Sequence, residues 1–487
     1  MNNTAAQPQS ASEYPFFKIT TDEILKDFES ISAVKVKAHE TILDEFLAEI
    51  ESIDFREILG IDKQANIPQK HFVVLVIDEI LRLIKQNNFG LCAKNDFIYL
   101  FNGVFWKPID REEFRSFLGK AAARLGINEL ESKHFAFRDS LYKQFICSAD
   151  APKIKETENT LINLQNGTLE VSEKGFHLRE HRREDFLTYQ LQFAFDEKAE
   201  KPLFDKYLQR TLPDCEMQKI LAEFIAYCFT RHLKLEKCLF LFGTGANGKS
   251  VCYDIVTALF GSESITSFSL NNLHEEHNRA LIVNKLLNYS SELGGKKAID
   301  SDLFKKLVSG ETVQCRLKYG NSFESNRYAK LMFNCNELPR DVEFTPAFFR
   351  RFLIIPFNEA IPESEQDSEL AKKIIKTELS GVFNWILDGL NRLLQQKRFT
   401  ESETVRKMNK DFREQSDSVQ MFLADNNYQK SALDFVSLKE LYGEYRQFCL
   451  DDGFKSLNKS NFSKRLETNG IQIETRNFGK AVCVSKS

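Results

Sequence analysis

Long apolar runs, paired cysteines and metal-binding spacings are all missing from this sequence of 487 residues. No stretch is long and apolar enough to span a bilayer, and the N-terminus has no apolar signal segment, so we expect no membrane contact and a cytoplasmic location. The ten cysteines include no C-x-x-C pair, and the eight histidines show no zinc-ligand spacing with them. This pattern excludes a disulfide framework and a zinc module, and it predicts reduced cysteines packed in the core.

An excess of positive charge is missing as well. The chain has 66 Lys and Arg against 70 Asp and Glu, which gives a formal net charge of −4. A uniformly basic nucleic-acid-binding surface is therefore excluded, and any such surface must be local. Charged residues at 28% and hydrophobic residues at 42% are ordinary for a globular protein, and the length predicts about three domains.

The most informative stretch runs from residue 238 to residue 260. Five apolar residues predict a buried strand at 238–242, and a helical apolar period follows at 251–260. The residues between them read G-x-x-x-x-G-K-S, and a strand, a glycine loop and a helix in this order are typical of a phosphate-binding loop. The predicted nucleotide-binding residues are Gly243, Thr244, Gly245, Ala246, Asn247, Gly248, Lys249 and Ser250.

Such a loop predicts ATP and Mg²⁺ as ligands. Glycines allow the backbone to approach phosphates closely, and the amides at the helix N-terminus then face the negative charge. Lys249 would neutralise the β and γ phosphates, and the Ser250 hydroxyl would ligate Mg²⁺. A chance match in a glycine turn is the alternative, and the buried strand in front of the loop disfavours it.

Polar side chains follow two later strands. Glu292 ends an apolar strand that begins at residue 286, and a carboxylate there can hold Mg²⁺ or polarise the attacking water. Ser291 stands where a second acid is expected, so Glu292 would carry both tasks. Asn336 ends the strand that begins at residue 330, and its amide can hydrogen-bond the γ-phosphate or the attacking water. Each could instead be an ordinary strand-end residue.

Two further signals are basic. Residues 312–323 predict a hairpin with Arg316, Lys318 and Tyr319 near its tip, and cations beside an aromatic ring suit the phosphates and bases of a single strand. Arg350 and Arg351 stand just before an apolar strand, and an arginine delivered across a subunit interface stabilises charge in phosphoryl transfer. A solvated surface hairpin and a pair of surface cations are the alternatives.

The order of these signals closely resembles the superfamily 3 helicase core, and most of all its poxvirus-type and phage or plasmid primase–helicase branch. Residues 99–110 and 162–171 also look like the domain that precedes the helicase there, so the resemblance covers about 90 to 487. It implies a hexameric AAA+-like ring with DNA in its channel, translocating 3′ to 5′. It also implies roles for single residues: Lys249 and Ser250 on ATP·Mg²⁺, Glu292 as the Walker B acid, Asn336 as sensor, Arg316 and Lys318 on a DNA-tracking hairpin, and Arg351 as arginine finger with Arg350 as second choice.

The fold that follows is α/β. We expect a disordered tail and helical segment (1–75), an α+β domain (76–200), an AAA+-like phosphate-loop ATPase core (201–375), a helical linker (376–428) and a C-terminal winged helix (429–487). Within the α+β domain, Asn-Gly turns predict hairpins at 97–107 and 161–171. The acidic end of the apolar run 72–79 looks like a Walker B strand, but its apolar residues continue at helical spacing and predict an amphipathic helix.

The predicted winged helix has a local positive charge. Seven Lys or Arg and two Glu lie between residues 455 and 487, which gives +5. Its second helix offers Lys459, Lys464 and Arg465, residue types that reach phosphates and base edges. Docking of another protein is the alternative role for this domain.

We therefore expect an ATP-dependent replicative DNA helicase of a phage, plasmid or other mobile element. Its partners would be single-stranded and forked DNA, further copies of the chain in a hexamer, and a replication partner or separate primase. Primase activity of its own is not expected, because helix capping explains the D-x-D pattern at Asp300 and Asp302. The first alternative is an ATP-dependent initiator that binds an origin and melts it locally, and the second is a different phosphate-loop enzyme such as a small-molecule kinase.

Overall fold

The computed structural model describes residues 38–62, 65–94, 97–149, 157–291, 293, 300–318, 320–339, 342–477 and 479–486. Two of the predicted site residues, Glu292 and Tyr319, lie outside these ranges. The chain divides into two compact units between Phe195 and Asp196, and each unit is described by itself.

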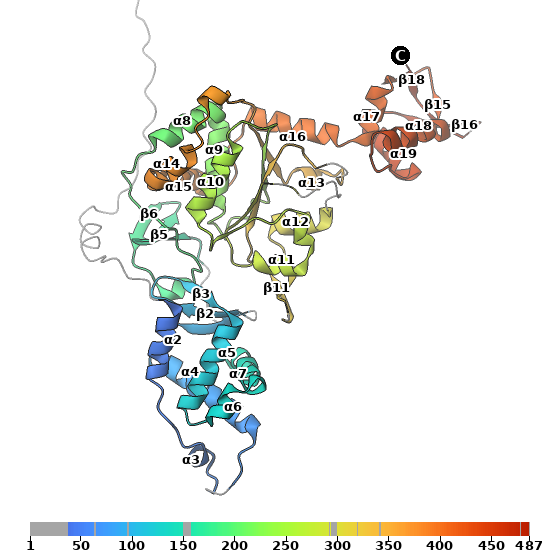
Figure 1. Ribbon diagram of the computed structural model, residues 1–487. Helices are drawn as coiled ribbons and strands as arrows, with labels where there is room; N and C mark the ends of the chain where they lie inside the picture. The colour runs from blue at the N-terminus through green and yellow to red at the C-terminus, as the bar shows by residue number, and fades with distance from the viewer. Residues whose placement is uncertain are drawn as a thin grey trace, which may run out of the picture. The chain divides into compact units, whose positions relative to one another are not determined.

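The first unit combines a helical core with two three-stranded antiparallel sheets, β1-β2-β3 and β4-β5-β6 (Figure 1). Its helices are α2 (His39–Ala48), α3 (Phe55–Leu59), α4 (Gln69–Gln86), α5 (Arg111–Arg124), α6 (Glu129–Lys133) and α7 (Phe135–Ser148). Its strands are β1 (Leu91–Lys94), β2 (Phe97–Phe101), β3 (Trp106–Ile109), β4 (Thr160–Leu164), β5 (Gly167–Ser172) and β6 (Gly175–Arg179).

Two local predictions for this unit are confirmed, the helix at 72–79 and the hairpins at the two Asn-Gly turns, while the predicted disordered tail falls within residues 1–37, outside the described residues. The run 72–79 lies inside the single helix α4, which buries Val76, Ile77 and Ile80 completely while Asp78 faces solvent. Both Asn-Gly turns join antiparallel strand pairs, β2 with β3 and β4 with β5. In the first turn the Asn102 side chain accepts hydrogen bonds from the two amides that follow Gly103, which has φ +95°.

The second unit is built on a five-stranded parallel sheet with the strand order β13-β7-β12-β9-β8. The strands are β7 (Cys238–Phe242), β8 (Ile265–Thr266), β9 (Leu287–Ser290), β12 (Lys330–Cys335) and β13 (Phe352–Pro356), and an antiparallel hairpin adds β10 (Val313–Arg316) and β11 (Ser322–Ser325). The helices are α8 (Pro202–Thr211), α9 (Cys215–Tyr227), α10 (Lys249–Phe260), α11 (Glu276–Leu281), α12 (Ser301–Ser309), α13 (Pro346–Phe349), α14 (Leu370–Thr377), α15 (Leu379–Gln396) and α16 (Glu403–Gln415).

Helices gather on both sides of this parallel sheet, with α8, α9, α10, α14 and α15 on one side and α11, α12 and α13 on the other (Figure 1). Strands buried on both faces need apolar residues at every position, which is why β7 reads Cys-Leu-Phe-Leu-Phe. Phe240 of β7 stacks between Phe333 of β12 and Phe352 of β13 at centroid distances of 5.6 and 4.7 Å. This aromatic layer joins three neighbouring strands, β13, β7 and β12, whose ends carry the candidate site.

The last part of the second unit has its own hydrophobic core, which includes Phe422, Tyr445 and Phe462. It contains α17 (Ser418–Asp425), α18 (Leu438–Asp451) and α19 (Lys459–Thr468), with strands β14 (Tyr428–Lys430), β15 (Val436–Ser437), β16 (Ile473–Arg476), β17 (Gly479–Val482) and β18 (Val484–Lys486). The two helices and the strand pair expected from the sequence are present in the expected order.

Three absences noted in the sequence can be compared with the described residues. Eight of the ten cysteines are buried, as predicted. The described residues contain no group of three or more His, Cys, Asp or Glu that could hold a metal ion. None of the described helices combines the length and apolar character needed to cross a bilayer.

Candidate functional site

The loop between β7 and α10 has a backbone that only glycine suits at several points. Gly245 and Gly248 have φ values of +120° and +87°, a region that residues with a side chain rarely adopt. Gly243 is needed for a different reason, because a Cβ there would lie 2.2 Å from Nδ2 of Asn247 and 2.6 Å from the carbonyl oxygen of Phe357. The glycines that define the sequence motif therefore have separate structural tasks.

Lys249 begins α10 and is only 7% exposed. Its Nζ donates hydrogen bonds to the carbonyl oxygen of Gly243 at 2.6 Å and to Oδ1 of Asn247 at 3.1 Å. Burial lowers the pKa of the ammonium group below that of an ordinary lysine. Among the residues that the structure describes, no carboxylate is hydrogen-bonded to it, so an anionic ligand would find a poorly compensated cation at this place.

Two side chains, one from the loop itself and one from α8, hold the loop in place. Asn247 is buried and donates from Nδ2 to the carbonyl oxygen of Phe357, the residue after β13, at 2.9 Å. The hydroxyl of Tyr207, on α8, donates to the carbonyl oxygen of Gly248 at 2.9 Å. Thr244, Ala246 and Ser250 are exposed. The sequence does not reveal this role of Tyr207, because Tyr207 and Gly248 are 41 residues apart in the chain.

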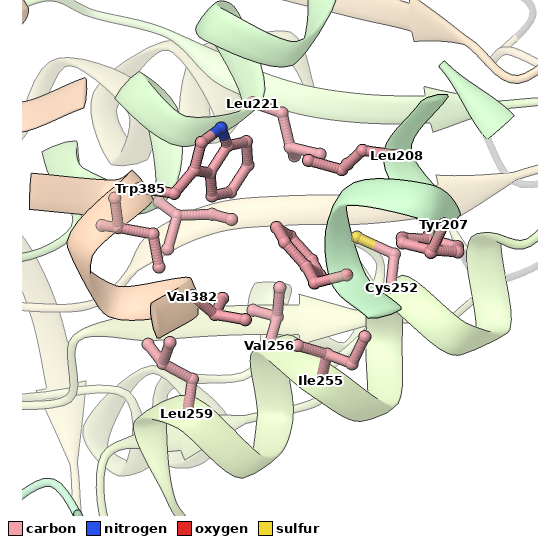
Figure 2. Close-up of a pocket in the computed structure, with 12 residues that line it drawn as sticks. Tyr207, Leu208, Leu221, Cys252, Ile255, Val256, Leu259, Val382 and Trp385 are labelled. Atoms are coloured by element: carbon pink, nitrogen blue, oxygen red, sulfur yellow. The ribbon is translucent and has the colours of Figure 1, made fainter. Parts of the chain in front are cut away.

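An apolar cluster supports the helix that follows the loop. Residues of α8, α9, α10 and α15, among them Leu221, Val256 and Trp385, surround a cavity of about 10 Å³ (Figure 2). This volume is at the limit for one water molecule, and the lining is apolar. The cavity is therefore a small gap within the apolar cluster that packs against α10, and it is too small to hold a nucleotide.

Asn336 lies beside the loop, as the parallel sheet requires. It follows β12 directly, and β12 neighbours β7 with Cys335 opposite Phe242. The amide of Gly243 donates to the carbonyl oxygen of Cys335 at 3.1 Å, so the loop and the end of β12 are joined. The Asn336 side chain is exposed. Because β9 ends at Ser290 on the other side of β12, the parallel strands bring three chain segments to one edge.

The two arginines lie at the opposite edge of the sheet, and they differ in environment. Arg351 has a side chain only 7% exposed, which donates from Nε and Nη2 to the Ser309 hydroxyl at 3.2 and 2.7 Å. Arg350 is 61% exposed and pairs with Glu236 at 2.8 Å. The role of Arg351 as a finger stays a prediction, and in this conformation its guanidinium is buried and bound within its own subunit.

The predicted hairpin is present as β10 and β11, with Val313 and Cys315 buried and Arg316 exposed. Arg316 donates from Nε to the carbonyl oxygen of Gly320 at 3.4 Å, within the hairpin itself. Lys318 is exposed at the tip. Figure 1 shows β11 projecting beyond α11, so the tip offers positive charge to solvent.

The three basic residues of α19 fall into two groups. Lys459 and Lys464 are exposed. Arg465 instead donates from Nε and Nη2 to Oδ2 of Asp417, at 2.8 and 2.6 Å. Asp417 is buried and also caps α17 by accepting from two backbone amides. The prediction that Arg465 contacts DNA stays a prediction, and the structure shows this side chain as the partner of a buried carboxylate.

Two family matches cover parts of the chain. Residues 78–213 match a family described as D5 N terminal like. Residues 241–351 match a family of unknown function (DUF5906), and this region begins in β7 and ends at Arg351. It contains the loop, Asn336, the hairpin and both arginines.

Two viral proteins are similar in sequence. One is named "Putative helicase 121R", from Invertebrate iridescent virus 3, and is 24% identical over 307 residues, or 56% of this chain and 32% of that protein. The other is "Putative helicase L207/L206" of Acanthamoeba polyphaga mimivirus, 24% identical over 260 residues, or 49% of this chain and 26% of that protein. The chain spans about a third or less of the length of these relatives.

Among solved structures, two apo structures of the NrS-1 C terminal region are similar. They are 12% identical, with TM-scores of 0.45 and 0.46, and the matches cover 84% and 85% of this chain and 98% and 99% of those chains. In sequence, the chain is thus related over part of its length to a D5 N terminal-like family and to two viral proteins that bear helicase names.

Proposed function

We propose that this chain is the ATP-hydrolysing part of a DNA helicase, an AAA+-like motor with a C-terminal winged helix that works as a ring of identical subunits. The proposal concerns the ATPase and its DNA contacts, because the chain spans only part of the viral relatives. The names of those relatives and the match at residues 78–213 support the class of reaction. The geometry around the loop supports the mechanism.

The loop suits a nucleoside triphosphate. The exposed backbone from Thr244 to Ala246 and the N-terminus of α10 offer amides to phosphates, and Lys249 supplies the cation. A phosphate would compete with the Gly243 carbonyl oxygen for Nζ of Lys249. Ser250 lies in the first turn of α10, where its hydroxyl would be a ligand for Mg²⁺, and Glu292 is the proposed acid. When bound, Mg²⁺ would neutralise charge that develops on the phosphates.

Asn336 is the proposed sensor for the γ-phosphate. It leaves β12 at the same edge as the loop, and the hydrogen bond between Gly243 and Cys335 ties the two segments together. An exposed amide at this place can orient a water molecule toward a phosphate.

The position of the arginines favours a shared site. The carbonyl oxygen of Arg351 accepts from the amide of Cys238, so the arginines stand where β13 and β7 begin. The phosphate loop starts five residues later, after about 16 Å of strand. Arg350 therefore lies far from its own loop and is exposed, as a residue that serves a neighbouring subunit would be, and it replaces Arg351 as our candidate finger.

DNA contact is proposed for Arg316 and Lys318 on the hairpin, with Tyr319 beside them, and for Lys459 and Lys464 on α19. The hairpin would follow a single strand through the ring, because cations with an aromatic ring suit a mobile backbone and its bases. Exposed lysines on a helix suit phosphates of duplex DNA. The two places would serve unwinding and recognition respectively.

The observation that carries the proposal is that the candidate residues lie at opposite ends of the parallel strands. Lys249 and Asn336 lie at the carboxyl ends, and Arg350 lies at the amino ends. The first test is ATP hydrolysis with and without single-stranded DNA over a salt series. Strong stimulation that falls as salt rises is expected, because each Lys or Arg contact to a phosphate releases counterions.

This assay, combined with footprinting, strand displacement and a measurement of the oligomeric state, separates the rival functions. Protection of a specific duplex without displacement of a long strand would indicate an initiator that melts DNA locally. Turnover that ignores DNA, in a chain that does not form oligomers, would indicate a small-molecule kinase and would overturn the helicase proposal.

A further inference from the structure

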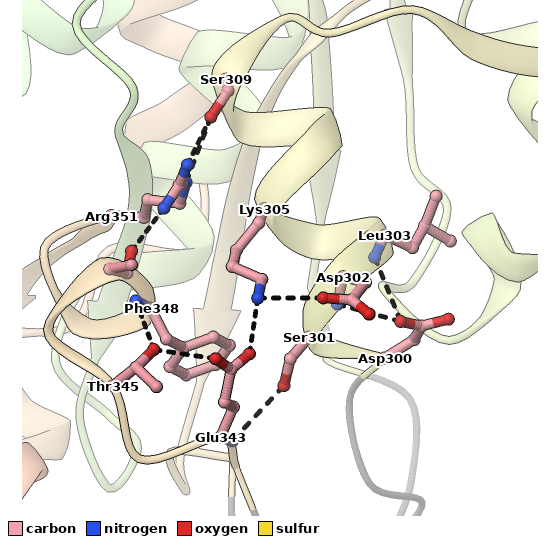
Figure 3. A network of polar contacts seen from close by, with 11 residues as sticks. Asp300, Ser301, Asp302, Leu303, Lys305, Ser309, Glu343, Thr345, Phe348 and Arg351 are labelled. Carbon is pink, nitrogen blue, oxygen red and sulfur yellow. Dashed lines mark hydrogen bonds and ion pairs between the residues drawn. The ribbon is translucent and has the colours of Figure 1, made fainter.

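We propose that the hydrogen bonds between Arg351 and Ser309 couple two parts of the chain. One is the arginine segment, residues 343–352, which contains the candidate finger, and the other is the hairpin β10–β11, for which DNA contact is proposed. The inference rests on the proposed function, since it connects that function's two ligand sites. It assigns a positioning role to Arg351 and to Ser309, neither of which would touch a ligand. Figure 3 shows the contacts that carry it.

The first contact joins the end of α12 to the arginine segment. The Ser309 hydroxyl is the acceptor for two N–H groups of Arg351, and both residues are buried, at 4% and 6% exposure. The remaining amino group of Arg351 donates to the carbonyl oxygen of Ala347. Arg351 thus joins Ser309 to the backbone of Ala347, three residues before Arg350, so a shift of the arginine segment would carry Ser309 with it.

A second contact lies toward the other end of α12. Lys305 donates to Glu343 at 2.7 Å, and Glu343 also accepts from the hydroxyl of Thr345, the residue that caps α13 (Figure 3). Between the two polar contacts, the Phe304 ring packs against Phe348 and Phe352 at centroid distances of 5.3 and 5.2 Å. Two polar anchors with a packed core between them make α12 and the segment 343–352 move as one body.

The third contact joins α12 to the hairpin. Ser309 is the last residue of α12, Gly310 follows with φ +68°, and β10 begins at Val313. The Tyr328 hydroxyl, just beyond β11, donates to the carbonyl oxygens of Lys306 and Glu311 at 3.1 and 2.7 Å. Both ends of the hairpin are therefore held at the C-terminus of α12, three residues or fewer from Ser309.

These contacts give a continuous path from Arg350 through Arg351, Ser309 and α12 to the hairpin base. If Arg350 moves when it contacts a nucleotide bound to a neighbouring subunit, this movement would displace the hairpin. The reverse also holds, so DNA on the hairpin would alter how Arg350 meets that nucleotide. DNA stimulation of hydrolysis is the measurable consequence.

The test uses the full chain with three substitutions: Ser309→Ala, which removes the acceptor, Ser309→Thr, which keeps a hydroxyl, and Ser264→Ala as control. Ser264 is equally buried, and its hydroxyl has no hydrogen-bond partner in the structure, so this control loses the same atom without losing a link. ATP hydrolysis is measured with and without a deoxythymidine homopolymer.

We expect Ser309→Ala to keep hydrolysis without DNA within about twofold of wild type and to lose about fivefold or more of the DNA stimulation. Ser309→Thr should restore the stimulation, and Ser264→Ala should behave as wild type. Unchanged stimulation in Ser309→Ala would overturn the link, as would an equal loss of hydrolysis with and without DNA. If wild type itself ignores DNA, the proposed function fails first and the link fails with it.

Discussion

Arg350 and Arg351 are adjacent in sequence, but their guanidinium groups share only one described partner, the carboxylate of Glu236, which lies 2.8 Å from Arg350 and 3.5 Å from Arg351. One side chain is turned to solvent and the other is turned into the interior. A carboxylate between them can hold Arg350 in position while leaving it exposed. The two arginines therefore have different tasks, and their substitution should have different effects.

Arg350→Ala should lower ATP hydrolysis about a thousandfold without loss of stability, because an exposed finger acts only on the transition state. Mixing it with Lys249→Ala should restore part of the activity, since a mixed interface can combine an intact loop with an intact arginine. Arg351→Ala should instead lower the free energy of unfolding by roughly 2–3 kcal/mol, the value of hydrogen bonds to a charged group. Chemical unfolding and ATPase assays distinguish the two variants. A large loss of hydrolysis without loss of stability in Arg351→Ala, and not in Arg350→Ala, would make Arg351 the finger.

Lys249→Ala should abolish ATP hydrolysis while the protein still folds. The buried ammonium group is the only full positive charge within residues 243–250, and its loss leaves a space that Ala does not fill. Circular dichroism and the rate of hydrolysis are the measurements. Lys372→Ala, on the exposed face of α14, is the matched control. Hydrolysis that persisted in Lys249→Ala would refute the assignment of the loop.

Lys318→Ala should reduce unwinding and DNA-stimulated hydrolysis more than hydrolysis without DNA, because Lys318 lies at the exposed tip of the hairpin and far from the loop in sequence. Gln314→Ala, which removes an exposed neutral side chain from the same hairpin, serves as control. Strand displacement and ATP hydrolysis are measured together. An equal loss of all three activities would mean that Lys318 supports the fold of the hairpin only.

Substitutions of two neighbouring residues of α19 should also have different effects, one on duplex binding and the other on stability. Lys464→Ala should weaken duplex binding and reduce the slope of log affinity against log salt by about one, as expected for one phosphate contact. Arg465→Ala should lower the free energy of unfolding by roughly 3 kcal/mol, because it leaves the buried carboxylate of Asp417 without its cation. Lys439→Ala on α18 is the control for a lost surface charge. Unchanged duplex binding in Lys464→Ala would favour protein docking.

Cys335 should resist alkylation although it lies beside the phosphate loop. Burial raises the pKa of its thiol to about 12, with partial compensation from Lys249. Only the thiolate reacts, and at pH 8 about one thiol in ten thousand would be ionised. Iodoacetamide followed by mass spectrometry should label the exposed Cys147 and Cys215 in the folded protein and leave Cys335 unmodified. Rapid labelling of Cys335 would show that this edge of the sheet opens in solution.

Local chemistry explains what could be read from the sequence. A loop such as 243–250 is specified by its own glycines, by the apolar strand before it and by the helix after it, so all the information lies within about twenty residues. The helix at 69–86 and both Asn-Gly hairpins are specified in the same way, by apolar period and by turn residues. Asp300 is another local case, because its carboxylate accepts from the amides of Asp302 and Leu303 and caps α12 as predicted.

Tertiary structure alone decided which side chains are available for function. Glu378 caps the first turn of α8 from 174 residues away, and buried Glu223 binds Arg392 and Thr400 across a similar separation. Arg351 and Arg465 likewise have distant partners, Ser309 and Asp417, which the sequence does not reveal. The sequence by itself determined the strand, the loop and the order of the signals, since these depend on backbone geometry and local period. Exposure and pairing depend on which segments meet in the folded chain, and no short-range pattern encodes that.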